Sequence, residues 1–214
     1  YTATSLPLTD YTWEIPVVGG ATGSSIIGGQ GSNIVTVNIG TVSGNIRVTP
    51  QTQGGSCAGT PATFFIDVRE RPELDTYPIT PVCSDDAIGI TLQEASGSVV
   101  PGSYKITNVT VAPGLNPSSR ALATGGANLI VADSYTNIGN GNTPLDVRYT
   151  IVPISAEGCE GTPKDIVVRI LPEPVVNPNL DRTVCSREVS NIVLQVASNS
   201  APADRFEIIN IENL

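Results

Sequence analysis

The sequence contains no histidine and no methionine, and it has a single tryptophan among its 214 residues. Histidine is the most common general base in enzymes and the most common zinc ligand, so its absence removes many hydrolase and metal-site designs. No apolar run approaches the roughly 18 residues that a membrane-spanning helix needs. Basic residues are scarce, since 11 stand against 20 acidic ones and the net charge is −9. We therefore expect no nucleic-acid partner and no membrane insertion by this segment.

β-Branched residues are abundant instead. Valine, isoleucine and threonine number 23, 21 and 22 against 12 leucines, a composition that favours strands over helices. Short runs of alternating apolar and polar residues recur, and no apolar stripe persists at helical spacing. The predicted strands cover residues 33–39, 45–48, 63–68, 88–92, 104–111, 146–152 and 165–170. This pattern predicts an all-β fold of antiparallel, immunoglobulin-like sandwiches.

The sequence also repeats itself. The tripeptide Val-Cys-Ser at 82–84 returns at 184–186, and the pattern Cys-x-Gly-Thr-Pro at 57–61 returns at 159–163, both at a shift of 102 positions. One shift shared by two separate motifs indicates tandem copies of a single structural unit.

Two proline-rich stretches separate the repeats. Residues 72–81 and 172–181 contain three prolines each, and proline holds itself and the preceding residue in extended conformations. We predict that both stretches are stiff linkers between domains that stand end to end. The predicted domains are a first repeat at 1–71 that lacks its N-terminal strand, a complete second repeat at 82–171, and the start of a third repeat at 182–214.

An aromatic residue recurs in each repeat, as Trp13, Tyr104 and Phe206, and an isoleucine follows each of them two positions later. Residues two apart on a strand point to the same side. The pattern therefore predicts a ring packed in the core between the sheets, rather than an exposed platform for sugar.

Four cysteines occupy the two recurring sites, and two pairing schemes respect the repeat. A Cys57–Cys83 bond would have to span a strand and a linker, whereas bridged Cα atoms lie within about 7 Å. Cys83 and Cys159 are expected at the same end of the second sandwich. We therefore predict a Cys83–Cys159 disulfide, with Cys57 and Cys185 pairing outside this segment. Such a bond implies an oxidising compartment, and hence an exported protein.

The predicted disulfide would bring four acidic residues together, namely Asp85, Asp86, Glu157 and Glu160. Carboxylates are typical calcium ligands. However, Arg187 and Glu188 replace the aspartate pair in the third repeat, and no Asp-x-Asp-x-Asp loop exists. A solvated acidic edge is therefore favoured over a calcium site. The sequence offers no set of catalytic, cofactor-binding or metal-ligating residues, and we do not expect an enzyme.

Several motifs together resemble a known family. They are Val-Cys-Ser at 82–84, the central aromatic, a strand that ends at Pro153, and the Cys-x-Gly-Thr-Pro turn before a strand and a proline-rich linker. The combination resembles the PKD-like repeats of the giant gliding-motility adhesins of Bacteroidota, of the SprB type. The resemblance is strongest at 83–92 and 159–170. It implies a cell-surface filament that is exported by type IX secretion and carried along the surface by a motor.

The resemblance gives the first functional hypothesis, a structural and adhesive repeat segment of a large exported adhesin that serves gliding motility and surface attachment. Its expected partners are neighbouring repeats of the same chain, the secretion and gliding machinery, and a polysaccharide or other surface ligand. The alternative is a non-catalytic binding or spacer module of a secreted polysaccharide-degrading enzyme. In that case exposed rings such as Tyr11, Tyr77 or Tyr135 would hold sugar. Both hypotheses place the protein at the cell surface or outside the cell.

Overall fold

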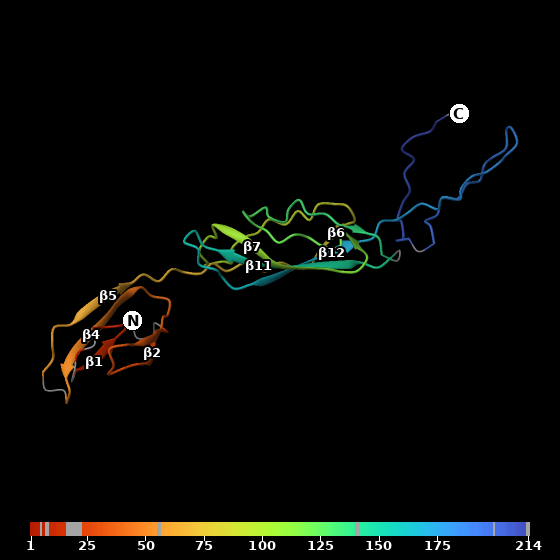
Figure 1. Cartoon of the computed structure of the whole chain (residues 1–214). Coiled ribbons are helices and arrows are strands. Elements are labelled where there is room, and N and C mark those ends of the chain that lie inside the picture. Colours follow the sequence, from red (N-terminus) through yellow and green to blue (C-terminus); the bar gives the residue numbers. More distant parts are fainter. Residues whose placement is uncertain are drawn as a thin grey trace. The chain divides into compact units, whose positions relative to one another are not determined.

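The computed structural model describes residues 1–4, 6, 9–15, 23–54, 57–139, 142–198 and 200–212. Within these residues every regular element is a β-strand, and no helix is long and apolar enough to cross a membrane. The chain divides into two compact units, 1–70 and 71–214, which are described separately (Figure 1). The predicted all-β class of tandem immunoglobulin-like sandwiches is confirmed.

The first unit is built on an antiparallel sheet with the strand order β1–β4–β5, and β2 and β3 form a second antiparallel pair. The strands are β1 (Thr9–Glu14), β2 (Ser25–Gly28), β3 (Thr36–Asn38), β4 (Gly44–Thr52) and β5 (Ala62–Ile66). Trp13 and Ile46 from the larger sheet share one core with Val37 and Ile26 from the smaller one. The two sheets therefore enclose a single apolar layer.

The second unit contains a five-stranded sheet with the order β6–β12–β11–β7–β9. Neighbouring strands are antiparallel, except that β6 runs parallel to β12. A short antiparallel pair, β8 and β10, lies within the long connection from β7 to β11. The strands are β6 (Thr80–Cys83), β7 (Ser103–Val111), β8 (Leu115–Asn116), β9 (Thr124–Gly125), β10 (Thr136–Asn137), β11 (Leu145–Ile154) and β12 (Lys164–Leu171).

Alternation places one face of β12 in the core. Ile166, Val168 and Ile170 are fully buried, while the residues between them reach the surface. Side chains two apart share a face of the strand, and burying each one stabilises the fold by about 1.5–3 kcal/mol. The other members of this core are Leu74, Ile88, Leu92, Tyr104, Ile106, Leu115, Ile130, Tyr135, Val147, Tyr149 and Ile151.

The strand registers show which positions correspond in the two units. Tyr11 lies opposite Pro50 in the first unit, and Tyr104 lies opposite Pro153 in the second. Both prolines accept a hydrogen bond from the glycine of the Cys-x-Gly-Thr-Pro turn, so they occupy equivalent sites. Tyr104 therefore corresponds to Tyr11, and its alignment with Trp13 from the sequence is wrong by two positions. The predicted burial of Trp13 and Tyr104 is confirmed.

The turn requires glycine because the backbone packs closely there. A Cβ on Gly59 would lie 2.9 Å from Cγ of Pro50, and one on Gly161 would lie 2.9 Å from Cγ of Pro153. On Gly161 it would also lie 1.8 Å from the carbonyl oxygen of Pro72. The recurring glycine thus marks the place where the turn, the preceding strand and, in the second unit, the incoming chain meet.

Residues 72–81, predicted to be a linker, are instead packed onto the second unit. Leu74 is buried in the core, and Nζ of Lys164 donates to its carbonyl oxygen at 3.0 Å. Tyr77 packs against the same core, and Thr80–Cys83 is β6 itself. Pro81 is tolerated there because β6 is an edge strand, where a missing N–H breaks no central ladder. The other predicted domain bounds stay predictions.

Residues 175–198 and Ser200 reproduce the local hydrogen bonds of residues 73–98. The amide of Val175 donates to Oγ of Ser200 at 2.6 Å, and the amide of Glu73 donates to Oγ of Ser98 at 2.7 Å. The further matching bonds are Asp75–Gln93 with Asn177–Gln195, and Ala95–Glu73 with Ala197–Val175. No strand is assigned to the described residues after β12, and Phe206, predicted to be a core aromatic, is 38% exposed. The start of the third repeat therefore shares the local hydrogen bonds of the second.

Candidate functional site

The second unit has two ends that carry the sequence motifs. At the distal end, where β12 finishes, Leu171 pairs with Cys83, and the amide of Ser84 donates to the carbonyl oxygen of Leu171 at 3.0 Å. At the proximal end, in the turn between β11 and β12, the amide of Cys159 donates to Oγ of Ser155 at 3.1 Å. The two cysteine motifs of one repeat thus mark its opposite ends.

This arrangement does not fit the predicted Cys83–Cys159 disulfide. At about 3.3 Å per residue, the length of β12 separates the two sites by roughly 20 Å, whereas bridged Cα atoms lie within about 7 Å. All four cysteines are free, and three of them are exposed while Cys159 is half-buried. The prediction fails because β6 runs parallel to β12 and so carries Cys83 to the distal end. The pairing of Cys57 and Cys185 outside this segment stays a prediction.

The acidic residues are divided in the same way. Asp85 and Asp86 follow Cys83 at the distal end, and Asp85 accepts a hydrogen bond from Oγ1 of Thr136. Glu160 lies at the proximal end, where its Oε1 is 3.1 Å from Nζ of Lys105. Glu157 lies in that same turn, so the four carboxylates do not converge. The described part of the chain contains no group of three or more cysteine and carboxylate side chains placed to hold a metal ion.

The rings considered for sugar binding are not exposed platforms. Tyr11 and Tyr135 are buried in the cores of their units. Tyr77 is half-buried, and its hydroxyl accepts a hydrogen bond from the amide of Gln93 at 2.6 Å. Burial raises the pKa of Tyr77. These rings act as packing residues, and the sugar-platform hypothesis loses the residues on which it rested.

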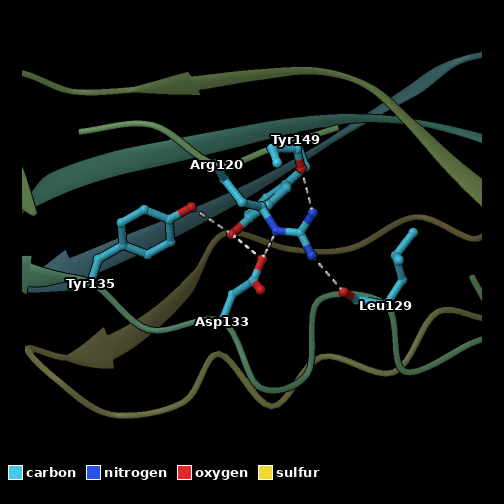
Figure 2. A network of polar contacts seen from close by, with 6 residues as sticks. Arg120, Leu129, Asp133, Tyr135 and Tyr149 are labelled. Carbon is cyan, nitrogen blue, oxygen red and sulfur yellow. Dashed lines mark hydrogen bonds and ion pairs between the residues drawn. The ribbon is translucent and has the colours of Figure 1, made fainter. Parts of the chain in front are cut away.

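A polar network that the sequence analysis did not predict ties the long connection from β7 to β11 to the sheet (Figure 2). Nε of Arg120 pairs with Oδ2 of Asp133, and another Arg120 nitrogen donates to the carbonyl oxygen of Leu129 at 2.8 Å. The hydroxyl of Tyr149, on β11, donates to the same Asp133 oxygen at 2.9 Å. The hydroxyl of Tyr135 lies 3.0 Å from that of Tyr149. The network thus bonds β11 of the sheet to the Arg120–Asp133 ion pair in the connection.

The two tyrosines of this network are neutral groups that hold the connection to the sheet by hydrogen bonds. Burial raises the pKa of Tyr149 far above its usual value, and the neighbouring Tyr135 and Asp133 add to the effect. Burial also raises the pKa of Tyr135. Both phenols therefore stay neutral and serve as hydrogen-bonding groups. A sequence signal existed, because Arg120 and Asp133 are the only charged residues between positions 112 and 139.

A shallow pocket of about 450 Å³ lies at the distal end, between the second repeat and the start of the third. It is lined by Ser84, Thr136, Asn137, Gly139, Pro172, Glu173, Val175, Ala197, Ser198 and Ser200. The polar groups of its wall already have hydrogen-bond partners. The amide of Asn137 donates to Oγ of Ser84 at 2.9 Å, and Nδ2 of Asn137 donates to the carbonyl oxygen of Ile170 at 3.1 Å. Glu173 is the single charged residue in its lining. We interpret the pocket as the place where two successive repeats meet.

Comparisons with known proteins agree with the repeat structure. Residues 3–64 match one model of the PKD-like domain, and residues 80–174 match a second model with the same description. Among solved structures, the fibronectin(III)-like modules of Clostridium thermocellum CbhA share 11% identity with the chain, over 80% of this chain and 81% of that chain. The TM-score of that match is 0.31. The search of curated proteins finds no match.

Proposed function

Because this chain carries PKD-like domains in tandem, we propose that it is a structural and adhesive repeat segment of a large exported adhesin filament. The filament serves surface attachment and gliding motility, as the resemblance to the SprB-type repeats implies. Its immediate partners are neighbouring repeats of the same chain. The secretion and gliding machinery and a polysaccharide or other surface ligand are its partners at the cell surface.

The recurrence of the same local contacts in successive repeats is the observation that carries this proposal. The same turn contact, from the glycine amide to a proline carbonyl oxygen, occurs at 2.7 Å in the first unit and 2.8 Å in the second. The hydrogen bonds at 73–98 return 102 positions later. A chain that forms the same local contacts in successive repeats is suited to a long tandem array.

The alternative, a sugar-binding module attached to a polysaccharide-degrading enzyme, has less support. Its three candidate rings are packed in or against the cores. The polar groups that do cluster, around Arg120 and Asp133, are satisfied by each other and by the backbone. PKD-like domains are typically non-catalytic modules, and we propose the same for this segment. Its proposed location is the cell surface.

An antibody raised against this chain tests the proposal on intact cells of the organism that makes it. We expect labelling without permeabilisation, and we expect deletion of the gene to abolish attachment to glass and spreading on a surface. A complemented strain is the control. Labelling only after permeabilisation, or a deletion strain that attaches and spreads normally, would contradict the adhesive role.

A further inference from the structure

The outer edge of β1 is closed by a side chain. β1 pairs with β4 on one side, and the backbone groups of Tyr11 and Trp13 form hydrogen bonds on its other side. The amide of Trp13 donates to Oε1 of Gln30 at 3.0 Å, and Nε2 of Gln30 donates to the carbonyl oxygen of Trp13 at 3.1 Å. Two residues earlier, Tyr11 exchanges two backbone hydrogen bonds with Gly31. Gln30 thus continues with its side chain the pairing that Gly31 makes with its backbone.

The two bonds of Gln30 have the pattern of one residue in an antiparallel strand. In such a strand pair, two facing residues exchange both of their N–H···O bonds. A glutamine amide carries both a donor and an acceptor, as a peptide unit does. Gln30 therefore occupies the backbone donor and acceptor that Trp13 would otherwise offer to a neighbouring strand.

The second unit closes the same edge position with backbone. Tyr104 corresponds to Tyr11, so Ile106, two residues further on, corresponds to Trp13. Tyr104 pairs with β9, and the amide of Ile106 donates to the carbonyl oxygen of Ala123 at 2.8 Å. This cover comes from the connection after β7, and among the described strands none that precedes β7 pairs with it. Both repeats therefore satisfy this position, one with backbone and the other with a side chain.

A tight turn holds Gln30 at this edge. Gly29 has a φ of +86°, and a Cβ there would lie 2.0 Å from the carbonyl oxygen of Ile34, so the turn requires glycine. The amide of Ser32 donates to the carbonyl oxygen of Gly29 at 3.0 Å and closes the turn around Gln30. Gln30 is exposed, so water could satisfy its amide equally well. Its position is therefore explained by what it does for the backbone of Trp13.

We propose that Gln30 protects the β1 edge against pairing with a strand from another copy of this chain. Uncovered strand edges are templates for association, and natural β-proteins block them with specific devices. A tandem array holds similar strands at a high local concentration, so an unprotected edge would join repeats sideways. This protective role does not depend on the adhesive role proposed above, because it needs only the fold of the first unit.

Amide hydrogen exchange of the full 214-residue chain is the first test. In dilute solution the amide of Trp13 should exchange several-fold faster in Gln30→Leu than in the unchanged chain, because leucine has no acceptor. The amide of Tyr11, which donates to Gly31, should stay protected and so report that the unit is folded. As the concentration rises, the Trp13 amide should become protected again, because a strand from another copy then accepts its hydrogen bond. Equal exchange of Trp13 in both chains, or no return of protection, would overturn the proposal.

Sedimentation of the same chains measures the association itself. We expect the average mass of Gln30→Leu to exceed that of the unchanged chain at equal concentration. Gln30→Glu should match the unchanged chain, because it loses the donated bond but places a charge on the edge, and charge opposes strand pairing. Thr52→Val is the matched control and should also match the unchanged chain. It removes the hydrogen bond from the amide of Cys57 to Oγ1 of Thr52, at 3.1 Å, without opening the β1 edge.

The two Gln30 variants separate edge protection from stability. If Gln30→Leu and Gln30→Glu associate to the same extent, the cause is a less stable first unit, and the protective role is refuted. If Gln30→Leu does not fold, Gln30→Asn gives the same test, because it keeps the amide and shortens the side chain by one methylene. An average mass equal to that of the unchanged chain in the folded variant would also refute the proposal.

Discussion

The hydroxyl of Tyr149 donates to Asp133 at 2.9 Å, so a residue in the middle of β11 is bonded to the connection that runs from β7 to β11. The same hydroxyl lies 3.0 Å from that of Tyr135. Tyr149 is fully buried. A polar group that lost its hydrogen-bond partner there could not bond to water instead.

Tyr149→Phe should therefore destabilise the second unit. The substitution removes two hydrogen bonds and leaves Tyr135 buried without its hydroxyl partner, at a cost of about 1–3 kcal/mol. Urea denaturation would measure the loss. Tyr104→Phe is the matched control, because Tyr104 is also buried in this core and has no described hydrogen-bond partner for its hydroxyl. An equal loss in both variants would show that ring packing, and not the network, is responsible.

The same residue predicts alkaline sensitivity. In the unfolded chain a tyrosine ionises near its usual pKa of 10.0, whereas burial raises the pKa of Tyr149 well above it in the folded chain. The free energy of unfolding should be unaffected by this group below about pH 10 and should fall as the pH rises above it. Denaturation curves between about pH 9 and about pH 11 would show the slope. Tyr149→Phe should make it shallower, and an unchanged slope would contradict the assignment.

Gly161→Ala should loosen the attachment of the incoming chain to the second unit. The new Cβ would lie 1.8 Å from the carbonyl oxygen of Pro72 and 2.9 Å from Pro153, so backbone must move. We expect a loss of about 2 kcal/mol or more and faster proteolysis near Pro72. Gly126→Ala is the control, since its Cβ would meet nothing within 4 Å. Equal stability of the two variants would show that the close contact imposes no constraint.

The positions of the cysteines predict their chemistry in this chain. Because Cys83 and Cys159 lie at opposite ends of β12, peptide mapping without reduction should find no bond between them within one copy. A thiol reagent should modify Cys57, Cys83 and Cys185 in the folded chain, and Cys159 more slowly because it is half-buried. Recovery of an intrachain Cys83–Cys159 peptide would overturn the strand order of the second unit.

The sequence predicted those parts of the fold that depend on local pattern. Alternation identified β7, β11 and β12, and the shared shift identified the tandem units, because both signals need only neighbouring residues or a repeated string. The direction of β6 could not be read in this way. The direction of Thr80–Cys83 relative to β12 is set by tertiary packing, which also buries Leu74 and Leu92. The expected closeness of Cys83 to Cys159, and with it the expected convergence of the four carboxylates, depended on that direction.

The correspondence between the two units shows a second limit of what the sequence alone can predict. Pairing Trp13 with Tyr104 satisfied the aromatic pattern, but register with Pro50 and Pro153 assigns Tyr11 to that position instead. The register also shifts within β7, since Ile106 pairs with Ile151 whereas Asn108 pairs with Thr150, and such bulges leave little trace in a single sequence.

The parallel pairing of β6 with β12 has a mechanical consequence. These strands are the first and last of the second unit's sheet, and tension applied to the chain pulls the start of β6 and the end of β12 in opposite directions along the strands. The bonds between Val168–Leu171 and Thr80–Cys83 are then loaded together in shear, whereas a peeling geometry would break them one after another. In this geometry all the hydrogen bonds between β6 and β12 oppose stretching of the domain at the same time.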